Sequence, residues 1–206
     1  MTAIVEPVPL SPTDVDAAAQ VLVRSFVDDP GLHFVLPDVA DRARLGPSLA
    51  RTVVHYVMRC GAPLATPDGV RGVALWFPPD APAPTEADLT ETGLAGVPDQ
   101  IGPEAWQRFQ RLLNHLDALH PRYAPDPHWY LAMLGVDPAW QRQGIGEALM
   151  QPVFTAADRE GLCCYLEAPT AGNARYYERR GFRVVAETDV PDSEVHIWLM
   201  RREPRQ

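Results

Sequence analysis

The sequence contains no lysine, and all 18 of its basic residues are arginines. Enzymes that form a Schiff base through a lysine amine, or that hold phosphate with the lysine of a Walker loop, are therefore excluded. No apolar run approaches the roughly 20 residues that a membrane-spanning helix needs. The first ten residues also lack the basic and apolar segments of a secretory signal, so we expect a cytoplasmic protein with no membrane partner.

Cysteine is scarce, since Cys60, Cys163 and Cys164 are the only three. An odd number that includes two neighbours, which a strand would point to opposite faces, argues against a disulfide framework. Structural zinc sites separate paired ligands by two to four residues, and no matching Cys/His pair accompanies these cysteines, so we expect no metal. An acyl-enzyme on Cys163 or Cys164 is a weaker alternative, because no histidine lies close in sequence to activate either thiol.

Positive charge is also limited, with 27 acidic residues against 18 basic ones and a net charge of -9. This balance disfavours nucleic acid as a partner. It suits a cationic small substrate, although ordinary solubility explains it equally well. A length of 206 residues fits one domain with a proper core. The sequence leaves a homodimer open.

Apolar periodicity and turn residues predict alternating strands and helices along the chain. The expected strands are 3–10, 63–66, 70–77, 128–136, 162–167, 182–188 and 194–200. The expected helices are one that starts at the Ser11-Pro12-Thr13-Asp14 cap and stops at Asp29-Pro30-Gly31, then 42–59, 144–159 and 174–180. Pro67-Asp68-Gly69 predicts a hairpin turn.

The proline-rich segment from Pro78 to Pro84 cannot continue a central strand, because proline donates no ladder hydrogen bond. We therefore expect an extended linker there. A largely helical insertion follows it, up to about residue 127. The apolar face expected for this insertion is Trp106, Phe109, Leu112, Leu113, Leu116 and Leu119.

The most informative segment is Gln141-Arg142-Gln143-Gly144-Ile145-Gly146, between an apolar strand and a predicted helix. Glycines at a helix start let several backbone N–H groups converge on an anion, and the helix dipole favours negative charge there. Tight turns use glycine for steric reasons as well, so the loop alone is weak evidence. A dinucleotide fingerprint would use Glu167 as its acid, but Arg142 occupies the position of the leading glycine.

The pattern Gln141-x-x-Gly144-x-Gly146 after an apolar strand resembles the acyl-CoA loop of the GNAT superfamily of N-acetyltransferases. The run from Asn173 to Phe182, with Tyr177-Glu178 and Gly181-Phe182, resembles the later signature of that superfamily. Within it, the stretch 129–200 is similar to the puromycin N-acetyltransferases. The first half of the chain resembles them only in the order of its elements.

The resemblance implies an α+β fold (α/β mixed sheet), a GNAT-like splayed, mostly antiparallel central sheet of about 6–7 strands flanked by helices. It also implies one acetyltransferase domain over 1–206, with a helical insertion at 79–127 before the central strand and an acetyl-CoA-binding core at 128–188. Acetyl-CoA would be the cosubstrate. The cofactor-binding residues that the resemblance implies are Leu134, Gly135, Val136, Gln141, Arg142, Gln143, Gly144, Ile145, Gly146, Glu147, Asn173 and Tyr177.

Acetyl transfer needs a neutral amine, whereas aliphatic amines are mostly protonated at pH 7, so a base must accept a proton. Glu167, at the end of a predicted strand beside the splay, is the first choice. Asp28, Asp29 and His33 are alternatives. Glu167 could equally be a solvated charge or an ion-pair partner of Arg175 or Arg179.

The departing thiolate needs a proton, and a neutral phenol can donate one. Tyr177 fits this role by its place in the motif. Tyr176 is adjacent, but successive helical residues point about 100° apart, so only one faces the thioester and we expect Tyr176 to pack in the core.

The leading hypothesis is therefore an acetyl-CoA-dependent N-acetyltransferase that acetylates a small-molecule amine by direct transfer, for detoxification of an antibiotic or metabolite. A peptide or protein acceptor is the first alternative. A non-catalytic acyl-CoA-binding sensor is the second, and it would need neither Tyr177 nor a base.

Overall fold

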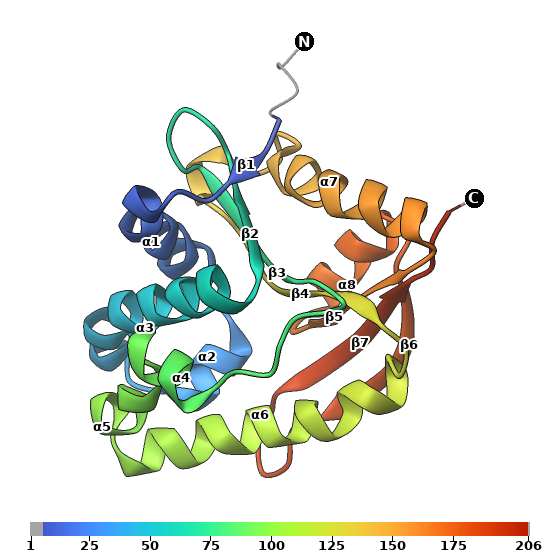
Figure 1. The fold of residues 1–206 in the computed structure, drawn as a ribbon. Helices are drawn as coiled ribbons and strands as arrows, with labels where there is room; N and C mark the ends of the chain where they lie inside the picture. Colours follow the sequence, from blue (N-terminus) through green and yellow to red (C-terminus); the bar gives the residue numbers. More distant parts are fainter. Residues whose placement is uncertain (1–5, 206) are drawn as a thin grey trace.

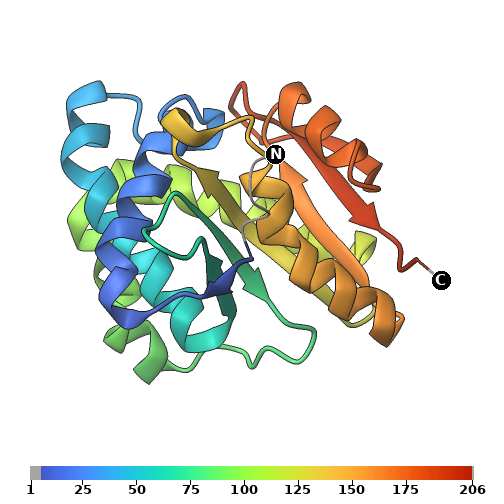
Figure 2. The same cartoon turned by 90° about the horizontal axis from the view of Figure 1, so that it is seen from above.

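A seven-stranded sheet with helices on both faces forms the framework of the protein in the computed structural model, which describes residues 6–205 (Figures 1 and 2). The strand order is β1-β2-β3-β4-β5-β7-β6, and β4–β5 is the parallel pair in an otherwise antiparallel sheet. This confirms the predicted fold class. The strands are β1 (Val8–Pro9), β2 (Ala62–Ala65), β3 (Gly72–Phe77), β4 (His128–Val136), β5 (Cys163–Ala168), β6 (Arg183–Asp189) and β7 (His196–Arg202).

Strand β4 has the predicted bounds, whereas the first strand is much shorter than expected. The range 3–10 was predicted from apolar residues, and 3–5 lie outside the described residues. Only Val8 and Pro9 pair with β2. The turn between β2 and β3 is confirmed, because Asp68 and Gly69 adopt positive φ angles of 55° and 100°.

Helices begin where side chains can cap their unpaired N–H groups. Ser11 caps the first one and Asp38 caps α3, as the hydroxyl and carboxylate accept backbone N–H groups. The helices are η1 (Pro12–Asp14), α1 (Val15–Ser25), α2 (Pro30–Val35), α3 (Val39–Cys60), α4 (Glu86–Glu91), η2 (Leu94–Gly96), α5 (Val97–Ile101), α6 (Pro103–Tyr123), η3 (Pro138–Trp140), α7 (Ile145–Glu160) and α8 (Ala171–Glu178). Among residues 6–205, no helix has the length and apolarity needed to cross a bilayer.

The prediction that Asp29-Pro30-Gly31 only ends the first helix was incomplete. Asp29 is the N-cap of α2, and its Oδ1 accepts a hydrogen bond of 2.8 Å from the Leu32 N–H. Pro30 occupies the first helical position, where its missing N–H costs nothing. The same residues that end α1 therefore start a second, short helix.

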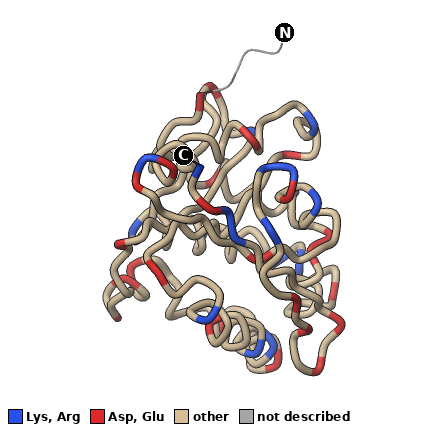
Figure 3. The backbone as a smooth tube through the Cα atoms, turned by 90° about the vertical axis from the view of Figure 1, so that its right-hand side faces the viewer, with Lys and Arg blue, Asp and Glu red and all other residues tan. Residues whose placement is uncertain are grey.

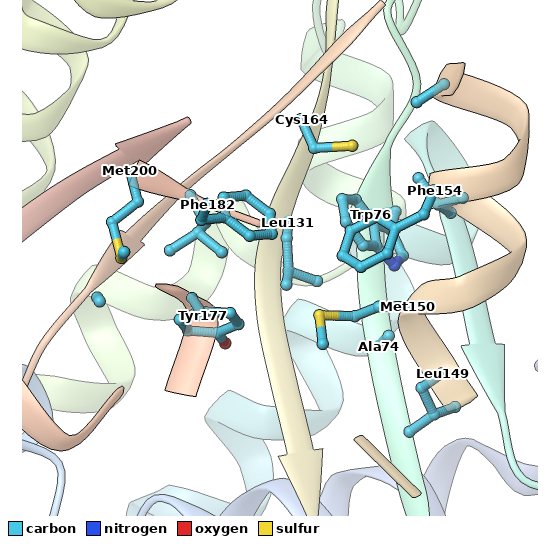
Figure 4. Packing of buried hydrophobic residues seen from close by; sticks show 14 of the residues in the cluster. Ala74, Trp76, Leu131, Leu149, Met150, Phe154, Cys164, Tyr177, Phe182 and Met200 are labelled. Atoms are coloured by element: carbon cyan, nitrogen blue, oxygen red, sulfur yellow. The ribbon is translucent and has the colours of Figure 1, made fainter. Parts of the chain in front are cut away.

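The two faces of the sheet are covered by different helices. Helices α7 and α8 pack on the face that carries Ala74 and Trp76, and this side holds the largest apolar cluster (Figure 4). Helices α1 and α3 pack on the opposite face, against Val73 and Leu75. Figure 2 shows α6 behind the sheet and α7 in front of it. The period-two alternation of β3 explains this division.

Helix α6, the longest helix of the insertion, packs against a smaller apolar cluster on the sheet. Leu112, Leu116 and Leu119 pack against buried residues of β5 and β7, as their helical spacing predicts. Leu113 is 38% exposed and does not belong to this face, which corrects its predicted place. Because successive helical residues point about 100° apart, Leu112 and Leu113 cannot both face the sheet.

A bulge in β4 opens the sheet. Leu75 of β3 pairs with Met133 and Trp76 pairs with Leu131, so Ala132 is an extra residue without a partner on β3. Pairing of β4 with β5 stops just before it, at Tyr130 and Tyr165. Bulges bend a strand and increase its twist. The bulge therefore lies where β4 turns away from β5, which gives the splay that the resemblance implied.

Candidate active site

The open edge of β4 is the first element of the candidate site. From residue 131 to 136 the strand pairs with β3 on one side, and on the β5 side it has no strand partner within residues 6–205. Leu134, Gly135 and Val136 lie in this segment, as predicted. Unpaired backbone N–H and C=O groups at such an edge can bind an extended amide-containing arm as an added strand.

The loop between β4 and α7 presents its backbone N–H groups. None of the N–H groups of residues 142 to 147 donates a hydrogen bond within the part of the chain that the structure describes. Arg142 and Gly144 have positive φ angles of 61° and 84°, and nothing lies within 4 Å of where a Cβ on Gly144 would be. Gln143 lies between these two residues, and Ile145 follows Gly144. The first turn of α7 is thus an open anion cradle.

Two anchors hold this loop against the end of β4. Gln141 Nε2 donates to the Val136 carbonyl oxygen over 3.1 Å. Asp137 accepts from Arg24 Nε on α1 at 2.8 Å and also caps η3 through the Ala139 N–H. Gln141 therefore positions the loop, and its predicted contact with the cofactor stays a prediction.

Gly146 is required by a close approach between α7 and α8. A Cβ on Gly146 would overlap the hydroxyl oxygen of Tyr176. The Tyr176 ring lies 3.6 Å under the Arg180 guanidinium, and Arg180 donates to Glu147 Oε2 at 3.2 Å. Tyr176 therefore packs beside the cradle, at the edge of the core, and Glu147 is engaged in an ion pair on the protein side.

Asn173 lies in the first turn of α8. Its backbone N–H donates to the N-cap Thr170 Oγ1 at 3.1 Å, and its Oδ1 accepts from the same hydroxyl at 2.8 Å. The Asn173 side chain is exposed. Its predicted contact with the pantetheine arm stays a prediction.

Tyr177 is buried in the cluster between β4 and α8 (Figure 4). Its ring is 9% exposed and its centroid lies 5.7 Å from that of Phe182. Burial raises the pKa of its phenol well above the ordinary value, so Tyr177 is protonated at neutral pH. A protonated phenol can act as an acid but not as a base.

Glu167 points to the other face of β5 and is not a solvated charge. Its side chain is 8% exposed, and its Oε1 has no hydrogen-bond partner among the described residues. Burial raises the pKa of Glu167 to about 7, and the neighbouring phenols of Tyr130 and Tyr165 partly oppose this shift. Neither Arg175 nor Arg179 pairs with it within residues 6–205. Glu167 is poised to exchange a proton near neutral pH.

Of the other three candidate bases, Asp29 and His33 make structural contacts, whereas Asp28 is exposed. Asp29 caps α2, and His33 Nε2 lies 2.7 Å from the Val27 carbonyl oxygen. The two neighbouring cysteines are both buried. Burial raises the pKa of Cys164 to about 12, which is the opposite of what a thiolate nucleophile needs.

Sequence reasoning missed His120, which lies beside Glu167, and His128, which contacts His120. His120 Nδ1 is 3.8 Å from Glu167 Oε1, and His120 Nε2 is 2.7 Å from His128 Nε2. The two histidines come from α6 and β4, and Glu167 comes from β5. The histidines are eight residues apart in the sequence, across one segment with three prolines, and nothing in this spacing predicts that they meet.

The charge of -9 does not single out one binding face. Figure 3 shows acidic and basic residues over all parts of the fold. The charged groups that could matter for chemistry are the few that lie at the splay.

Comparisons with known proteins agree with this geometry. Residues 110–184 match the acetyltransferase (GNAT) domain family. An uncharacterized N-acetyltransferase of Schizosaccharomyces pombe is 27% identical over 93% of this chain and 80% of its own length.

Two crystal structures share the fold over nearly the whole chain. One is a Corynebacterium glutamicum protein described as histone acetyltransferase HPA2 and related acetyltransferase, with a TM-score of 0.64, 22% identity and coverage of 98% of this chain and 97% of that one. The other is arylalkylamine N-acetyltransferase 2 of Aedes aegypti, with a TM-score of 0.67, 17% identity and coverage of 98% and 99%. Residues 110–184 therefore match an acetyltransferase (GNAT) domain, and the chain shares its fold with known acetyltransferases over nearly its whole length.

Proposed function

We propose that the protein uses acetyl-CoA to acetylate an amine of a small molecule by direct transfer. The observation that carries this proposal is the buried carboxyl of Glu167 beside the open edge of β4. A base with a pKa near neutrality, next to a strand edge that can bind an extended arm, is what deprotonation of an amine nucleophile requires.

The residues present fit acetyl-CoA. The cradle offers unpaired N–H groups and the positive end of α7 to a diphosphate, and Arg142 beside it is exposed. The open edge of β4 offers backbone groups to the pantetheine amides, at about 1 kcal/mol net for each hydrogen bond. When bound, acetyl-CoA supplies an activated acetyl thioester. Its binding residues would be Leu134, Gly135, Val136, Gln141, Arg142, Gln143, Gly144, Ile145, Gly146, Glu147, Asn173 and Tyr177.

Protein groups would divide the proton chemistry between the two faces of the sheet. Glu167 accepts the proton of the acceptor amine on the α6 face. Tyr177, protonated because burial raises its pKa, gives a proton to the leaving thiolate from the α8 face. A backbone N–H near Leu134 would stabilise the oxyanion that develops during transfer.

A small acceptor fits the α6 face better than an extended chain. Leu112, Leu116 and Leu119 of α6 cover the region next to Tyr165, and Phe34 of α2 closes it from another side. This apolar cover favours a compact amine near Glu167. Antibiotics and toxic metabolites with an amine are acceptors of this size, and detoxification in the cytoplasm is the role we propose.

The names of the two similar structures mark both acceptor classes. The Aedes aegypti protein is named for arylalkylamines, and the Corynebacterium glutamicum protein is described as a histone acetyltransferase. Since one fold serves both, an acceptor panel should contain aliphatic and aromatic amines, amine-bearing antibiotics and short peptides with free α-amino or lysine amines.

Thiol release from acetyl-CoA across this panel tests the proposal, with mass spectrometry of the products. We expect a mass gain of one acetyl group on a small amine and none on the enzyme itself. Acetylated peptides only would identify a peptide acetyltransferase. Tight acetyl-CoA binding without turnover would identify a sensor.

A Tyr177→Phe variant tests the acid. Loss of the phenol should lower kcat by about tenfold or more, because a general acid contributes about 10²–10⁴ in rate and water replaces only part of it. The Kd for acetyl-CoA, measured by calorimetry, should change little. Unchanged kcat would exclude Tyr177 as the acid.

A further inference from the structure

Three polar side chains lie one after another on the α6 face of the sheet, joined by one hydrogen bond between the histidines and one longer contact to Glu167. Glu167 Oε1 on β5 lies 3.8 Å from His120 Nδ1 on α6. His120 Nε2 lies 2.7 Å from His128 Nε2 at the start of β4. His128 Nδ1 in turn lies 2.7 Å from the carbonyl oxygen of Asp126, in the exposed segment before β4. The path leads from the buried carboxyl to the surface.

The last contact fixes the protons on both rings. A carbonyl oxygen can only accept, so His128 must carry a proton on Nδ1 and, when neutral, accepts at Nε2. His120 must then donate from Nε2, which leaves the lone pair of its Nδ1 facing Glu167. Two acceptors would repel each other, so a proton belongs between Glu167 and His120.

The surroundings decide which of the two holds this proton. The groups that face them are the phenols of Tyr130 on β4 and Tyr165 on β5, and the carboxylate of Asp117 on α6. Burial, together with the neighbouring His128, lowers the pKa of His120 to about 4, whereas burial raises that of Glu167 to about 7. Below the pKa of Glu167 the shared proton therefore rests on its carboxyl, and His120 is a neutral acceptor.

Apolar side chains of α6 cover much of the Glu167 carboxyl on this face. Leu116 and Leu119 of α6 pack over the strand next to it. Glu167 lies two residues beyond the last β4–β5 pair, and His128 lies two residues before it. Four residues of strand span about 13 Å, which no single side chain can bridge.

We propose that His120 and His128 form a proton exit path that returns Glu167 to its basic state after each turnover. This inference rests on the proposed function, because the proton is the one taken from the acceptor amine. The O–H bond of Glu167 breaks as the Nδ1–H bond of His120 forms. The Nε2–H bond of His120 breaks as that of His128 forms, and His128 releases its Nδ1 proton to water beside Asp126.

Each ring gains one proton and loses one, so the path carries no net charge after the transfer. Both rings end in the opposite tautomer. Water can restore the starting tautomers, since 23% of the His120 side chain is exposed. His120 and His128 are thus positioning and relay residues that act through Glu167.

Kinetics of four histidine variants test the path. His120→Gln and His128→Gln should each lower kcat about tenfold or more, with the KM for acetyl-CoA unchanged. His115→Gln is the matched control, because His115 lies on the same helix, bonds to Thr188 and is outside the path. Added imidazole should raise the kcat of His120→Ala but not that of His115→Gln. Equal kcat in all three glutamine variants would overturn the path.

An infrared titration of the free protein tests the coupling without any substrate. The band of a protonated carboxyl should be absent from Glu167→Gln, and its titration midpoint should move in His120→Gln but not in His115→Gln. A band that does not move would overturn the path, whatever the kinetics show. If no amine is acetylated, the proposed function fails, while this titration still decides whether His120 and Glu167 share a proton.

Discussion

The two faces of strand β5 carry different kinds of side chain, although their residues alternate along the same six positions. Cys164, Leu166 and Ala168 point toward α7 and α8 and are all buried among apolar neighbours. Tyr165 and Glu167 point toward α6 and place a phenol and a carboxyl beside an apolar cluster. One face stabilises the fold, and the other holds the titratable groups.

This difference shows how an acetyltransferase can place a buried acid beside its core without unfolding it. The apolar face supplies burial at roughly 25 cal/mol for each Å². The polar face carries one carboxyl whose ionisation is opposed by burial and assisted by two phenols. Changes on the α6 face should therefore alter chemistry, and changes on the α7 face should alter stability.

The largest effect is expected from Glu167→Gln on the α6 face. Removing the base should lower kcat by about 10²–10⁴, the usual contribution of general base catalysis. In the wild-type protein, kcat/KM should rise with pH through about 7 as Glu167 loses its proton. Stopped-flow or thiol-release assays at several pH values measure both. A wild-type level of kcat in the variant would leave Glu167 without a catalytic role.

Asp158→Asn, on the α7 face, should lower the stability of the protein and leave catalysis unchanged. Arg202 is 3% exposed and donates two hydrogen bonds to Asp158, at 2.7 and 2.8 Å. Leaving this guanidinium buried without its partner should lower the free energy of unfolding by roughly 3–5 kcal/mol. Urea unfolding at pH 7 measures the loss, and kcat of the folded fraction should be unchanged.

The pH dependence gives the Asp158 prediction an internal control. Arg202 lowers the pKa of Asp158, so the stabilisation is present above the unfolded-state pKa, about 3.9, and is lost as pH falls through the lower folded-state value. Wild type and Asp158→Asn should therefore become similar in stability under strongly acidic conditions. A constant difference down to pH 2 would contradict an ionic origin.

Glu167→Gln should also stabilise the protein at high pH. The pKa of Glu167 is raised from 4.5 to about 7 in the folded state, so the folded protein binds more protons than the unfolded chain between these values. Stability present below pH 4.5 is then lost as pH rises through 7, by up to roughly 3 kcal/mol. Thermal unfolding at pH 4.5 and pH 8 should show the variant more stable only at pH 8.

The smallest effect is expected from a substitution in the anion cradle, on the affinity for acetyl-CoA. Gly146→Ala forces the Tyr176 hydroxyl away and should weaken acetyl-CoA binding about tenfold, roughly 1.4 kcal/mol. The matched control is Gly172→Ala in the first turn of α8, where a Cβ meets only Thr170 Oγ1 at 3.6 Å. Adding Tyr176→Phe to Gly146→Ala should restore part of the affinity. Calorimetric Kd values decide between a local clash and a general loss of fold.

Most of the secondary structure could be predicted from the sequence, because its signals are local. The bounds of β4, the turn at Asp68-Gly69 and the Gly161 C-cap of α7, with φ of 70°, follow from apolar runs and glycine positions. The backbone cradle at Gly144 is legible for the same reason, since neighbouring residues build it. Asp29 shows the limit, because one residue can end one helix and cap the next.

The predicted roles of Glu167 and Tyr177 came from a resemblance, and their surroundings could not be read from the chain. No local pattern distinguishes Tyr176, which lies beside Gly146, from Tyr177, which lies in the main cluster. Nor does any pattern bring His120 beside Glu167, because 46 intervening residues fold through β4 and α7 first.

The sequence by itself determined which segments form strands and helices, where the anion cradle lies and that lysine chemistry is absent. Only the tertiary structure decided that Ala132 bulges out of β4 where the sheet opens, and that Glu167 is buried against two phenols and a histidine. The physical reason is that backbone geometry depends on a few adjacent residues. The protonation state of a carboxyl depends on burial and on groups that reach it from three separate elements.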